Sequence, residues 1–558
     1  MPVLAGKTVL LELLKQEGVR VLFGNPGTTE LPLMDALAVE PAIRYVLALQ
    51  EAPAMAMADG YAQASGGLAA VNLHVAPGLG NAMGMLYDAQ KAGSPILVTA
   101  GQHEQTFNFT EPLLWADLPR IAQPFVKWAH EVRRLEDLPR AIHRAAKTAL
   151  APPTGPVFLS LPGDILTGSA EVALGAPSRI APRLRPDAAA LAEAARLIAR
   201  AERPVVMAGD AVPAAGALAE LVAFAEAIGA PVWDECMASR AMFPASHPLC
   251  RGSFARLPHV IRGILAEHDL LISIGADLFT LSLPGAVESL PEGMGIVHLD
   301  TDPWELAKNY PEQVSLLADP KAALPELTAA VTAAFGPAGA ARAAERLAQH
   351  RAHGIASLER LRAEAAALAD RTPIAPLALL GAVASMLPPR TIVIDESVSS
   401  GAGLRRLMPC DDAASFFGLR GGGIGWGLPA AIGAKLAQPE RKVVALIGDG
   451  SAMYTIQGLW TAAQQKLDVV FIIINNSSYR ILKQRTNAMG GFAQQTDRYV
   501  GMELDNPAVD FVAVAGGLGL AATRARNIAE VRAQLAAALD ADGPSLIDVM
   551  VDRSFKPL

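Results

Sequence analysis

The sequence predicts an α/β protein with three doubly wound domains, each built on a parallel sheet. Short runs rich in Val, Ile and Leu alternate with Ala- and Leu-rich helical patterns along the 558 residues. Runs that are apolar on both faces and separated by helices are typical of parallel strands covered on both sides. A chain of this length is also too long for one hydrophobic core. The predicted strands are RVLFG (20–24), AAVNLHV (69–75), PILVTAG (95–101), PVFLSLP (156–162), PVVMAGD (204–210), LLISIG (270–275), GIVHLD (295–300), TIVIDE (391–396), VVALIGDG (443–450) and VVFIIINN (469–476).

Two segments of different composition divide the chain. One is rich in Pro and Arg, around residues 176–188, and the other is a charged helical stretch around residues 340–376. Such segments are typical of linkers and boundaries between domains. We expect domains at residues 1–175, 185–340 and 360–558. The opening segment, MPVLAGKTVLLELLKQEG, is expected to be an amphipathic helix and not a signal peptide.

The composition excludes several classes of function. The net charge is −8 and no block of basic residues occurs, which argues against a nucleic-acid partner. No uninterrupted apolar run is long enough to span a membrane. The cysteines, Cys236, Cys250 and Cys410, lie far apart without CxxC spacing, which suits a reducing compartment and gives no zinc site. We therefore expect a soluble cytoplasmic protein.

The stretch 443–479 predicts a β-α-β unit with polar side chains after each strand. Asp449 follows the first strand, and Asn476 follows the second. The crossover makes the strands parallel, so both side chains lie at the edge where open α/β sheets bind ligands. Oxygen ligands of this kind suit Mg²⁺ or Ca²⁺, and the glycines of GDG let backbone N–H groups approach a phosphate. A tight turn followed by Asn caps would explain the same residues.

The spacing of GDG and NN, with 24 residues between them, resembles the thiamine diphosphate (ThDP) binding motif. This resemblance implies that Asp449, the Asn476 side chain and the Ser478 carbonyl hold the metal on the diphosphate. Further residues are expected to contact the cofactor on the same ground: Ser399, Gly448, Gly450, Ser451, Tyr454 and Tyr479.

A wider resemblance, to the benzoylformate decarboxylase family, runs over nearly the full length. The segments that carry it are VLFGNPGTTELP (21–32), LALQEA (47–52), NLHVAPGLGNAMG (72–84), PFVKWAHE (124–131), GGGIGWGLPAAIGAKLAQPERKVVALIGDGSAMYTIQGLWTAAQ (421–464) and NNSSY (475–479). The resemblance implies a pyrimidine-binding, a middle and a diphosphate-binding domain, in that order. It also implies a homodimer at least, and commonly a homotetramer, with each site shared between subunits.

Three residues acquire cofactor roles from this resemblance. Glu51 would face the aminopyrimidine ring and share a proton with it. A glutamate at a helix start without this context would be explained by its favourable interaction with the helix dipole. Gly422 would offer its carbonyl to the cofactor's amino group, and Ile424 would force the bent cofactor conformation. The surrounding GLRGGGIGWG (418–427) lacks the strand-to-helix context of a dinucleotide fingerprint.

The catalytic and pocket residues depart in part from the family pattern. His74 matches the first family histidine, and Thr28 stands at the family's serine position. Ser282 stands where the family has its second histidine, and a serine is no acid near pH 7. His103 could compensate, or could be an ordinary surface residue. The substrate pocket is expected to include Leu114, Ser282, Ile481, Leu482 and Arg485. Ile481 would narrow an aryl pocket, and Arg485 would clamp a carboxylate or simply be solvated.

The sequence therefore predicts ThDP-dependent, non-oxidative decarboxylation of a 2-keto acid, with carboligation to an aldehyde as a side activity. The alternative is an acetolactate synthase-like carboligase or another ThDP-dependent C–C lyase. We do not expect FAD, which some such carboligases carry on the middle domain. Intact Glu51, Asp449 and Asn476 disfavour a non-catalytic ThDP-binding protein, and no fingerprint supports a nicotinamide oxidoreductase.

Overall fold

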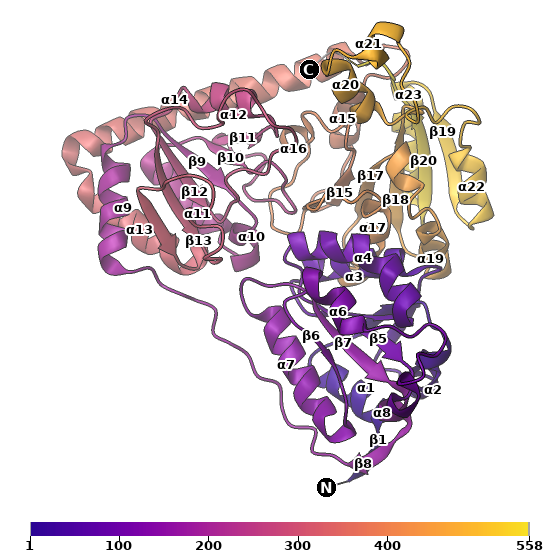
Figure 1. The fold of residues 1–558 in the computed structure, drawn as a ribbon. Helices are drawn as coiled ribbons and strands as arrows, with labels where there is room; N and C mark the ends of the chain where they lie inside the picture. The colour runs from indigo at the N-terminus through magenta and orange to yellow at the C-terminus, as the bar shows by residue number, and fades with distance from the viewer. Residues whose placement is uncertain (1, 556–558) are drawn as a thin grey trace.

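Three six-stranded parallel sheets follow one another along the chain (Figure 1). The computed structural model describes residues 2–555. All ten runs predicted from the sequence form strands, so the predicted fold class is confirmed. Central strands such as β4 (Ala69–Leu73), β12 (Leu270–Ile274) and β18 (Val469–Asn475) are buried along their whole length, because helices cover the sheets on both sides. No helix within residues 2–555 has the length and apolar character needed to cross a membrane.

The first sheet has the strand order β3-β2-β4-β5-β7-β6. The predicted opening helix is preceded by a short strand, β1, which pairs antiparallel with β8, so α1 begins only at Gly6. The elements of this part are β1 (Val3–Ala5), α1 (Gly6–Gln16), β2 (Val21–Gly24), η1 (Thr28–Glu30), α2 (Leu31–Leu37), β3 (Arg44–Leu47), α3 (Glu51–Ser65), β4 (Ala69–Leu73), α4 (Val75–Lys91), β5 (Ile96–Gln102), α5 (Gln105–Asn108), α6 (Leu118–Ala122), η2 (Gln123–Phe125), β6 (Ala129–Glu131), η3 (Leu135–Asp137), α7 (Leu138–Leu150), β7 (Val157–Pro162), α8 (Gly163–Thr167) and β8 (Ser169–Glu171).

The second sheet has the order β11-β10-β9-β12-β13-β14. Residues 172–187, which contain no helix or strand, lead into it as an extended segment (Figure 1). Its elements are α9 (Ala188–Arg200), β9 (Pro204–Ala208), α10 (Ala211–Ala215), α11 (Leu218–Ile228), β10 (Val232–Asp234), β11 (Cys250–Ser253), α12 (Pro258–Leu265), β12 (Leu270–Ile274), β13 (Gly295–Asp300), β14 (Val314–Leu317) and α13 (Pro320–Ala334). The long helix α14 (Gly336–Ala367) then runs along the outside of the molecule to the third sheet (Figure 1).

The third sheet has the order β16-β15-β17-β18-β20-β19. The single crossover helix predicted between residues 443 and 479 is in fact two short helices, α18 and α19, joined by a turn. The elements are α15 (Pro376–Ala384), β15 (Ile392–Glu396), α16 (Leu404–Leu407), β16 (Phe416–Gly418), α17 (Gly427–Ala437), β17 (Val443–Gly448), α18 (Asp449–Ala452), α19 (Gly458–Gln464), β18 (Val469–Asn475), α20 (Arg480–Ala488), α21 (Phe492–Thr496), α22 (Phe511–Gly517), β19 (Ala521–Ala525), α23 (Ile528–Asp540) and β20 (Ser545–Met550).

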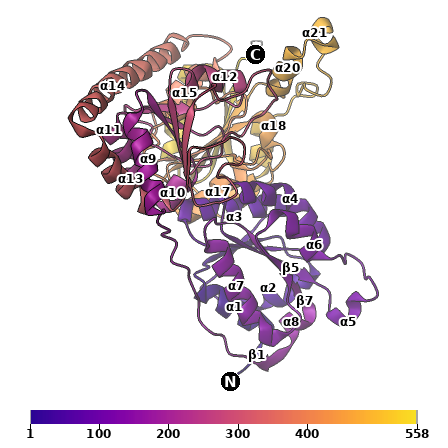
Figure 2. The same ribbon diagram turned by 60° about the vertical axis from the view of Figure 1, so that its left-hand side comes forward.

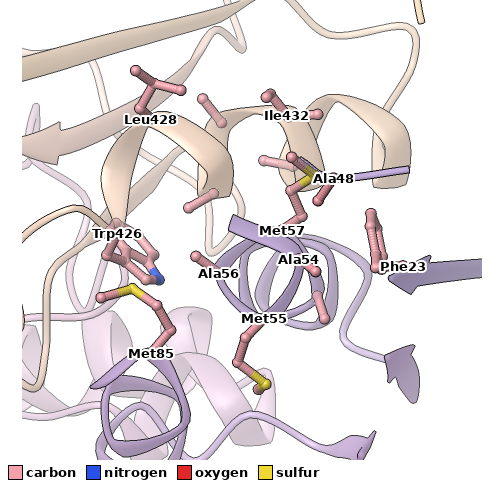
Figure 3. Packing of buried hydrophobic residues seen from close by; sticks show 14 of the residues in the cluster. Phe23, Ala48, Ala54, Met55, Ala56, Met57, Met85, Trp426, Leu428 and Ile432 are labelled. Carbon is pink, nitrogen blue, oxygen red and sulfur yellow. The ribbon is translucent and has the colours of Figure 1, made fainter. Parts of the chain in front are cut away.

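The first and third sheets share one hydrophobic core through helices α3 and α17 (Figure 2). Figure 3 looks along α3, with α17 passing across it and Trp426, Met57 and Met85 packed at the crossing. A Cβ atom on Gly60 would lie 2.2 Å from the Ala430 carbonyl oxygen, and one on Gly433 would lie 1.9 Å from that of Met57. These glycines let the two backbones touch, which fixes the position of the loop that leads into α17.

Candidate active site

Asp449 and Asn476 come together at the carboxyl edge of the third sheet. Asp449 begins α18 directly after β17, and Asn476 follows β18, the parallel neighbour of β17. Both side chains are buried. Burial raises the pKa of Asp449 to about 6. The charge of Arg480 acts on Asp449, but no ion pair to this carboxylate forms within residues 2–555, so the carboxylate is suited to a cation that arrives with the ligand.

The oxygen ligands around Asp449 fit a Mg²⁺ ion bound to a diphosphate. The Asn476 amide oxygen accepts hydrogen bonds from the N–H and the hydroxyl of Ser478, at 3.0 and 2.9 Å, so the amide lies at the turn that also carries the Ser478 carbonyl. Residues 2–555 contain no cluster of three or more His, Cys, Asp or Glu suited to a metal. A site with one carboxylate and neutral oxygens leaves coordination positions for phosphate oxygens, which is the usual arrangement for Mg²⁺.

Several of the other expected cofactor residues surround the same turn. Tyr479 packs its ring against Gly450, and Tyr454 contacts Gly425. Tyr454 is 57% exposed. The Ser399 carbonyl accepts a hydrogen bond from Arg480, the first residue of α20, which also bonds the Asp552 carbonyl at 2.9 Å. These contacts hold the start of α20 beside the Asp449 turn.

Residues Gly421–Gly427, here called the glycine loop, lie at the same edge and are held by buried carboxyl groups. Glu396, at the end of β15, accepts hydrogen bonds from the N–H groups of Gly425 and Gly427 at 2.5 and 2.6 Å. Asp88, from α4, accepts one from Gly423 at 3.0 Å. Gly422 is exposed with a φ of 86°, and Ile424 is half-buried. The loop therefore presents Gly422 outward, while hydrogen bonds hold Gly423, Gly425 and Gly427.

Glu51 is the first residue of α3 and lies at the carboxyl edge of the first sheet. Its side chain is buried, with 5% of the residue exposed. The amides of Asn25 and Asn81 donate to its two carboxylate oxygens at 3.4 and 3.0 Å. Both donors are neutral amides, so they fix the position of the carboxylate without pairing it with a charge.

His74 lies at the same edge, directly after β4, and Glu30 orients it. The His74 Nδ1 atom is 2.8 Å from a Glu30 carboxylate oxygen and 3.2 Å from the Thr29 hydroxyl. A Cβ atom on Gly27 would lie 2.1 Å from Nδ1, so only glycine leaves room for the ring. Contact at Nδ1 leaves Nε2 as the nitrogen available to a ligand. Val75, the next residue, has a φ of 39°, a strained conformation for a β-branched residue.

Sequence reasoning missed Glu30, although it lies within the motif GTTE. Glu30 is almost completely buried and also accepts hydrogen bonds from the N–H groups of Gly27 and Gly101, at 2.9 and 3.0 Å. The sequence did contain one indication of its role, because Glu30 stands two residues after Thr28 at a helix start. Asp88 and Glu396 were missed as well, because their partners lie far away in the sequence.

The expected pocket residues lie in exposed or half-exposed segments. Thr28 is exposed at the start of η1, and Leu114 has a left-handed backbone with a φ of 71°. The Ser282 N–H donates to the Arg256 carbonyl at 3.0 Å. Burial lowers the pKa of Arg256, and the charge of Arg485 lowers it further, so α20 and the Ser282 segment are neighbours.

The remaining expected residues differ in their exposure and in their contacts. Ile481 and Arg485 are half-buried, one turn apart on α20, and Leu482 is 44% exposed. His103 interacts through Nε2 with the Leu113 carbonyl at 2.6 Å, and its ring packs edge-on against Phe107. His103 is thus tied to its own loop.

Comparison with known proteins matches all three parts of the chain to domains of thiamine pyrophosphate enzymes. Family profiles described as the N-terminal TPP binding domain, the central domain and the C-terminal TPP binding domain of thiamine pyrophosphate enzymes match residues 4–111, 191–327 and 402–549. Benzoylformate decarboxylase of Pseudomonas aeruginosa is 35% identical over 544 residues, covering 96% of this chain and 97% of that protein.

Two further relatives represent both activities within the family. The large subunit of acetolactate synthase isozyme 1 of Escherichia coli is 30% identical over 560 residues, covering 99% of this chain and 94% of that protein. The solved structure of the thiamine diphosphate-dependent 4-hydroxybenzoylformate decarboxylase of Rhodococcus jostii RHA1 superposes with a TM-score of 0.86 at 33% identity, covering 98% of this chain and 99% of that chain. The chain therefore belongs to the family of thiamine diphosphate-dependent decarboxylases and carboligases.

Proposed function

We propose that this enzyme decarboxylates a 2-keto acid without oxidation, with ThDP and Mg²⁺ as cofactors, and that it also joins the product to an aldehyde acceptor. The family supplies the general chemistry. The finer assignment rests on the residues at the two sheet edges, and in particular on a histidine fixed by a buried carboxylate.

The cofactor would be held mainly by the third sheet. Asp449, the Asn476 side chain and the Ser478 carbonyl would bind Mg²⁺, while the Gly422 carbonyl and the Ile424 side chain would position the pyrimidine and thiazolium rings. When bound, ThDP supplies the carbon nucleophile and accepts the electrons released as carbon dioxide leaves. The exposed Gly422 and the buried Asp449 carboxylate support this arrangement.

Glu51 and His74 would handle protons. Glu51, fixed by two amides, would share a proton with the pyrimidine ring and so activate the cofactor. His74 would exchange a proton with substrate or product through Nε2, because Glu30 occupies Nδ1. Thr28 offers a hydroxyl on the adjacent turn. The contact between His74 and Glu30 is the observation that carries the decarboxylase assignment, since an aldehyde product requires a positioned proton donor.

Ser282 and Ile481 support a carboligase component and define the second candidate function. Ser282 cannot replace the histidine expected at its position as an acid near neutral pH. Slower protonation would leave more time for attack on a second carbonyl compound, as an acetolactate synthase-like carboligase requires. Ile481 would favour short aliphatic substrates over aryl ones, and Arg485, near the Ser282 segment, is available to a carboxylate.

A homodimer is the minimal assembly that we propose, and a homotetramer is expected. Exposed apolar side chains flank both halves of the site: Leu49, next to Glu51, is 45% exposed, and Met453, near Asp449, is 41% exposed. Exposed apolar surface at a functional edge is typical of an interface. We also place the enzyme in the cytoplasm, because its three buried cysteines are all free.

Calorimetric titration of the purified protein with ThDP tests the cofactor assignment. Binding should require Mg²⁺, disappear on chelation and return when the metal is restored. Asp449→Ala should abolish binding, whereas Asp542→Ala, an exposed aspartate, should bind as the wild type does. Wild-type affinity in Asp449→Ala would contradict the proposed metal site.

A further inference from the structure

The middle domain has the strand order of a dinucleotide-binding sheet. Counted along the chain, β11-β10-β9-β12-β13-β14 reads 3-2-1-4-5-6, and the winding reverses between β9 and β12. In open sheets of this kind, ligands bind outside the carboxyl ends of the strands at that reversal point. Here the crevice is closed, because a Cβ atom on Gly209, which follows β9, would lie 2.0 Å from the Gly275 carbonyl oxygen, which follows β12.

A side chain from the third domain occupies this edge instead. The Arg420 guanidinium lies 3.2 Å from Asp210, 3.1 Å from Glu235 and 2.9 Å from Asp277, and it also donates to the Met237 carbonyl. Asp210, Glu235 and Asp277 follow β9, β10 and β12, respectively. The guanidinium thus contacts the ends of the three strands that would surround a nucleotide.

This arrangement is buried and internally connected. The Arg420 side chain is 8% exposed and that of Glu235 is 1% exposed. Glu235 also accepts hydrogen bonds from the backbone N–H groups of Asp210 and Asp277, at 3.3 and 2.9 Å, so it joins the three loops. Burial raises the pKa of Asp210 and Glu235, and the Arg420 charge opposes that rise. Loss of the guanidinium would leave buried carboxyl groups without a cation.

Arg420 is also the residue that precedes the glycine loop. Two carboxyl groups of the first domain reach the loop: Asp88 accepts from Gly423 at 3.0 Å, and Asp59 accepts from the Trp426 indole at 2.7 Å. Glu396 of the third domain accepts from Gly425 and Gly427. The loop is therefore held by the first and third domains, and the middle domain reaches its start through Arg420, two residues after Gly418, whose N–H donates to the Ser239 carbonyl at 3.0 Å.

We propose that Arg420 is a positioning residue that uses the closed nucleotide crevice of the middle domain as an anchor for the glycine loop, and so sets the place of the Gly422 carbonyl in the cofactor site. On this account the Arg420 guanidinium fills the site where a nucleotide would bind, so the middle domain binds no dinucleotide or adenine nucleotide. The claim that Arg420 affects cofactor binding rests on the proposed function, in which the Gly422 carbonyl contacts ThDP.

Arg420→Ala tests the anchor, and Arg405→Ala is the matched control. Arg405 is also a buried arginine that joins the third domain to the middle domain, with bonds of 2.9 and 2.7 Å to Asp234, but it does not adjoin the glycine loop. Without ThDP, hydrogen–deuterium exchange of residues 421–427 should become at least about tenfold faster in Arg420→Ala than in Arg405→Ala. The dissociation constant for ThDP should rise about tenfold or more, because affinity falls with the fraction of molecules whose loop is in place.

Rescue separates positioning from general damage. Guanidinium chloride at about 20 mM, compared with NaCl at equal ionic strength, should restore slow exchange and ThDP affinity to Arg420→Ala and leave the wild type unchanged. Arg420→Lys, which keeps the charge but cannot span three loops, should be intermediate. If Arg420→Ala does not fold, hydrogen–deuterium exchange of the glycine loop and ThDP affinity are measured in Arg420→Lys and Asp277→Asn instead, and both variants should show faster exchange and weaker binding than Arg405→Ala.

The possible results distinguish a failure of the proposed function from a failure of the Arg420 anchor. A wild type that does not bind ThDP with Mg²⁺ would contradict the proposed function. A wild type that binds ThDP, beside an Arg420→Ala protein with wild-type exchange and affinity, would overturn the anchor. Equal loss of affinity in Arg405→Ala and Arg420→Ala, or micromolar binding of FAD or ADP to the wild type, would overturn it too.

Discussion

Asp88→Asn should stabilise the protein, and increasingly so as the pH rises. Asp88 is buried on α4, accepts one hydrogen bond from Gly423, and has a second carboxyl oxygen with no hydrogen-bond partner. Burial, opposed by the Gly423 hydrogen bond and aided by the nearby carboxyl groups of Asp59 and Glu396, raises the pKa of Asp88 to about 8. The folded protein therefore holds a proton near neutral pH that the unfolded chain releases.

The size of the effect follows from this difference in proton binding. A folded pKa above the unfolded value of 3.8 costs stability as the pH rises from about 4 to about 8. The cost reaches about 4 kcal/mol at pH 7 and about 2 kcal/mol at pH 5, at about 1.4 kcal/mol for each unit. An asparagine at position 88 can still accept the hydrogen bond from the Gly423 N–H through its amide oxygen. Because it does not ionise, the variant does not lose this unfolding free energy as the pH rises.

Urea unfolding at pH 5, 6, 7 and 8, at one protein concentration, measures the difference. The gap in apparent unfolding free energy between Asp88→Asn and wild type should widen by about 2–3 kcal/mol from pH 5 to pH 7. Asp497→Asn, at an exposed position, should show no such trend. A gap that stays constant with pH would refute the account of Asp88 as a neutral, buried carboxyl group.

Three further predictions concern the site itself. Glu51→Gln should bind ThDP within about tenfold of wild type, while exchange of the cofactor's C2 proton, followed by NMR, slows by about 10²–10⁴-fold; wild-type exchange would show that another group activates the cofactor. Glu30→Gln should lower kcat about tenfold or more with little change in KM, because His74 loses the carboxylate that fixes its ring; an unchanged kcat would remove Glu30 from the mechanism. Ser282→His should lower the hydroxyketone fraction in favour of free aldehyde, measured by gas chromatography with an aldehyde acceptor present; an unchanged or rising fraction would contradict the assigned role of Ser282.

The sequence was sufficient to predict the sheet edges but not the contacts across domains. Asp449 and Asn476 could be placed together because each follows an apolar strand, and parallel neighbours end at one edge. The segment between them was predicted as one helix, whereas α18 ends at Ala452 and α19 begins at Gly458. The short strands β16 and β19 lie at the sheet margins and carry weaker patterns than the central runs.

Residues that act through distant partners gave no local signal. Arg420 precedes a glycine-rich stretch and resembles an ordinary charged loop residue until the middle domain is folded against it. Asp88 lies on a helix whose sequence carries no hint of a neighbour 335 positions away. Glu30 was the nearest to being predictable, because a carboxylate at a helix start is a recognised pattern, but its contact with His74 depends on the adjacency of β2 and β4.

Carbon dioxide release from a panel of 2-keto acids tests the central claim most directly. The purified enzyme would be assayed with benzoylformate and with short aliphatic 2-keto acids, with and without added ThDP and Mg²⁺. The account predicts release that requires both cofactors and is faster for the short aliphatic acids than for benzoylformate. No release from any 2-keto acid by enzyme with bound ThDP and Mg²⁺ would contradict it.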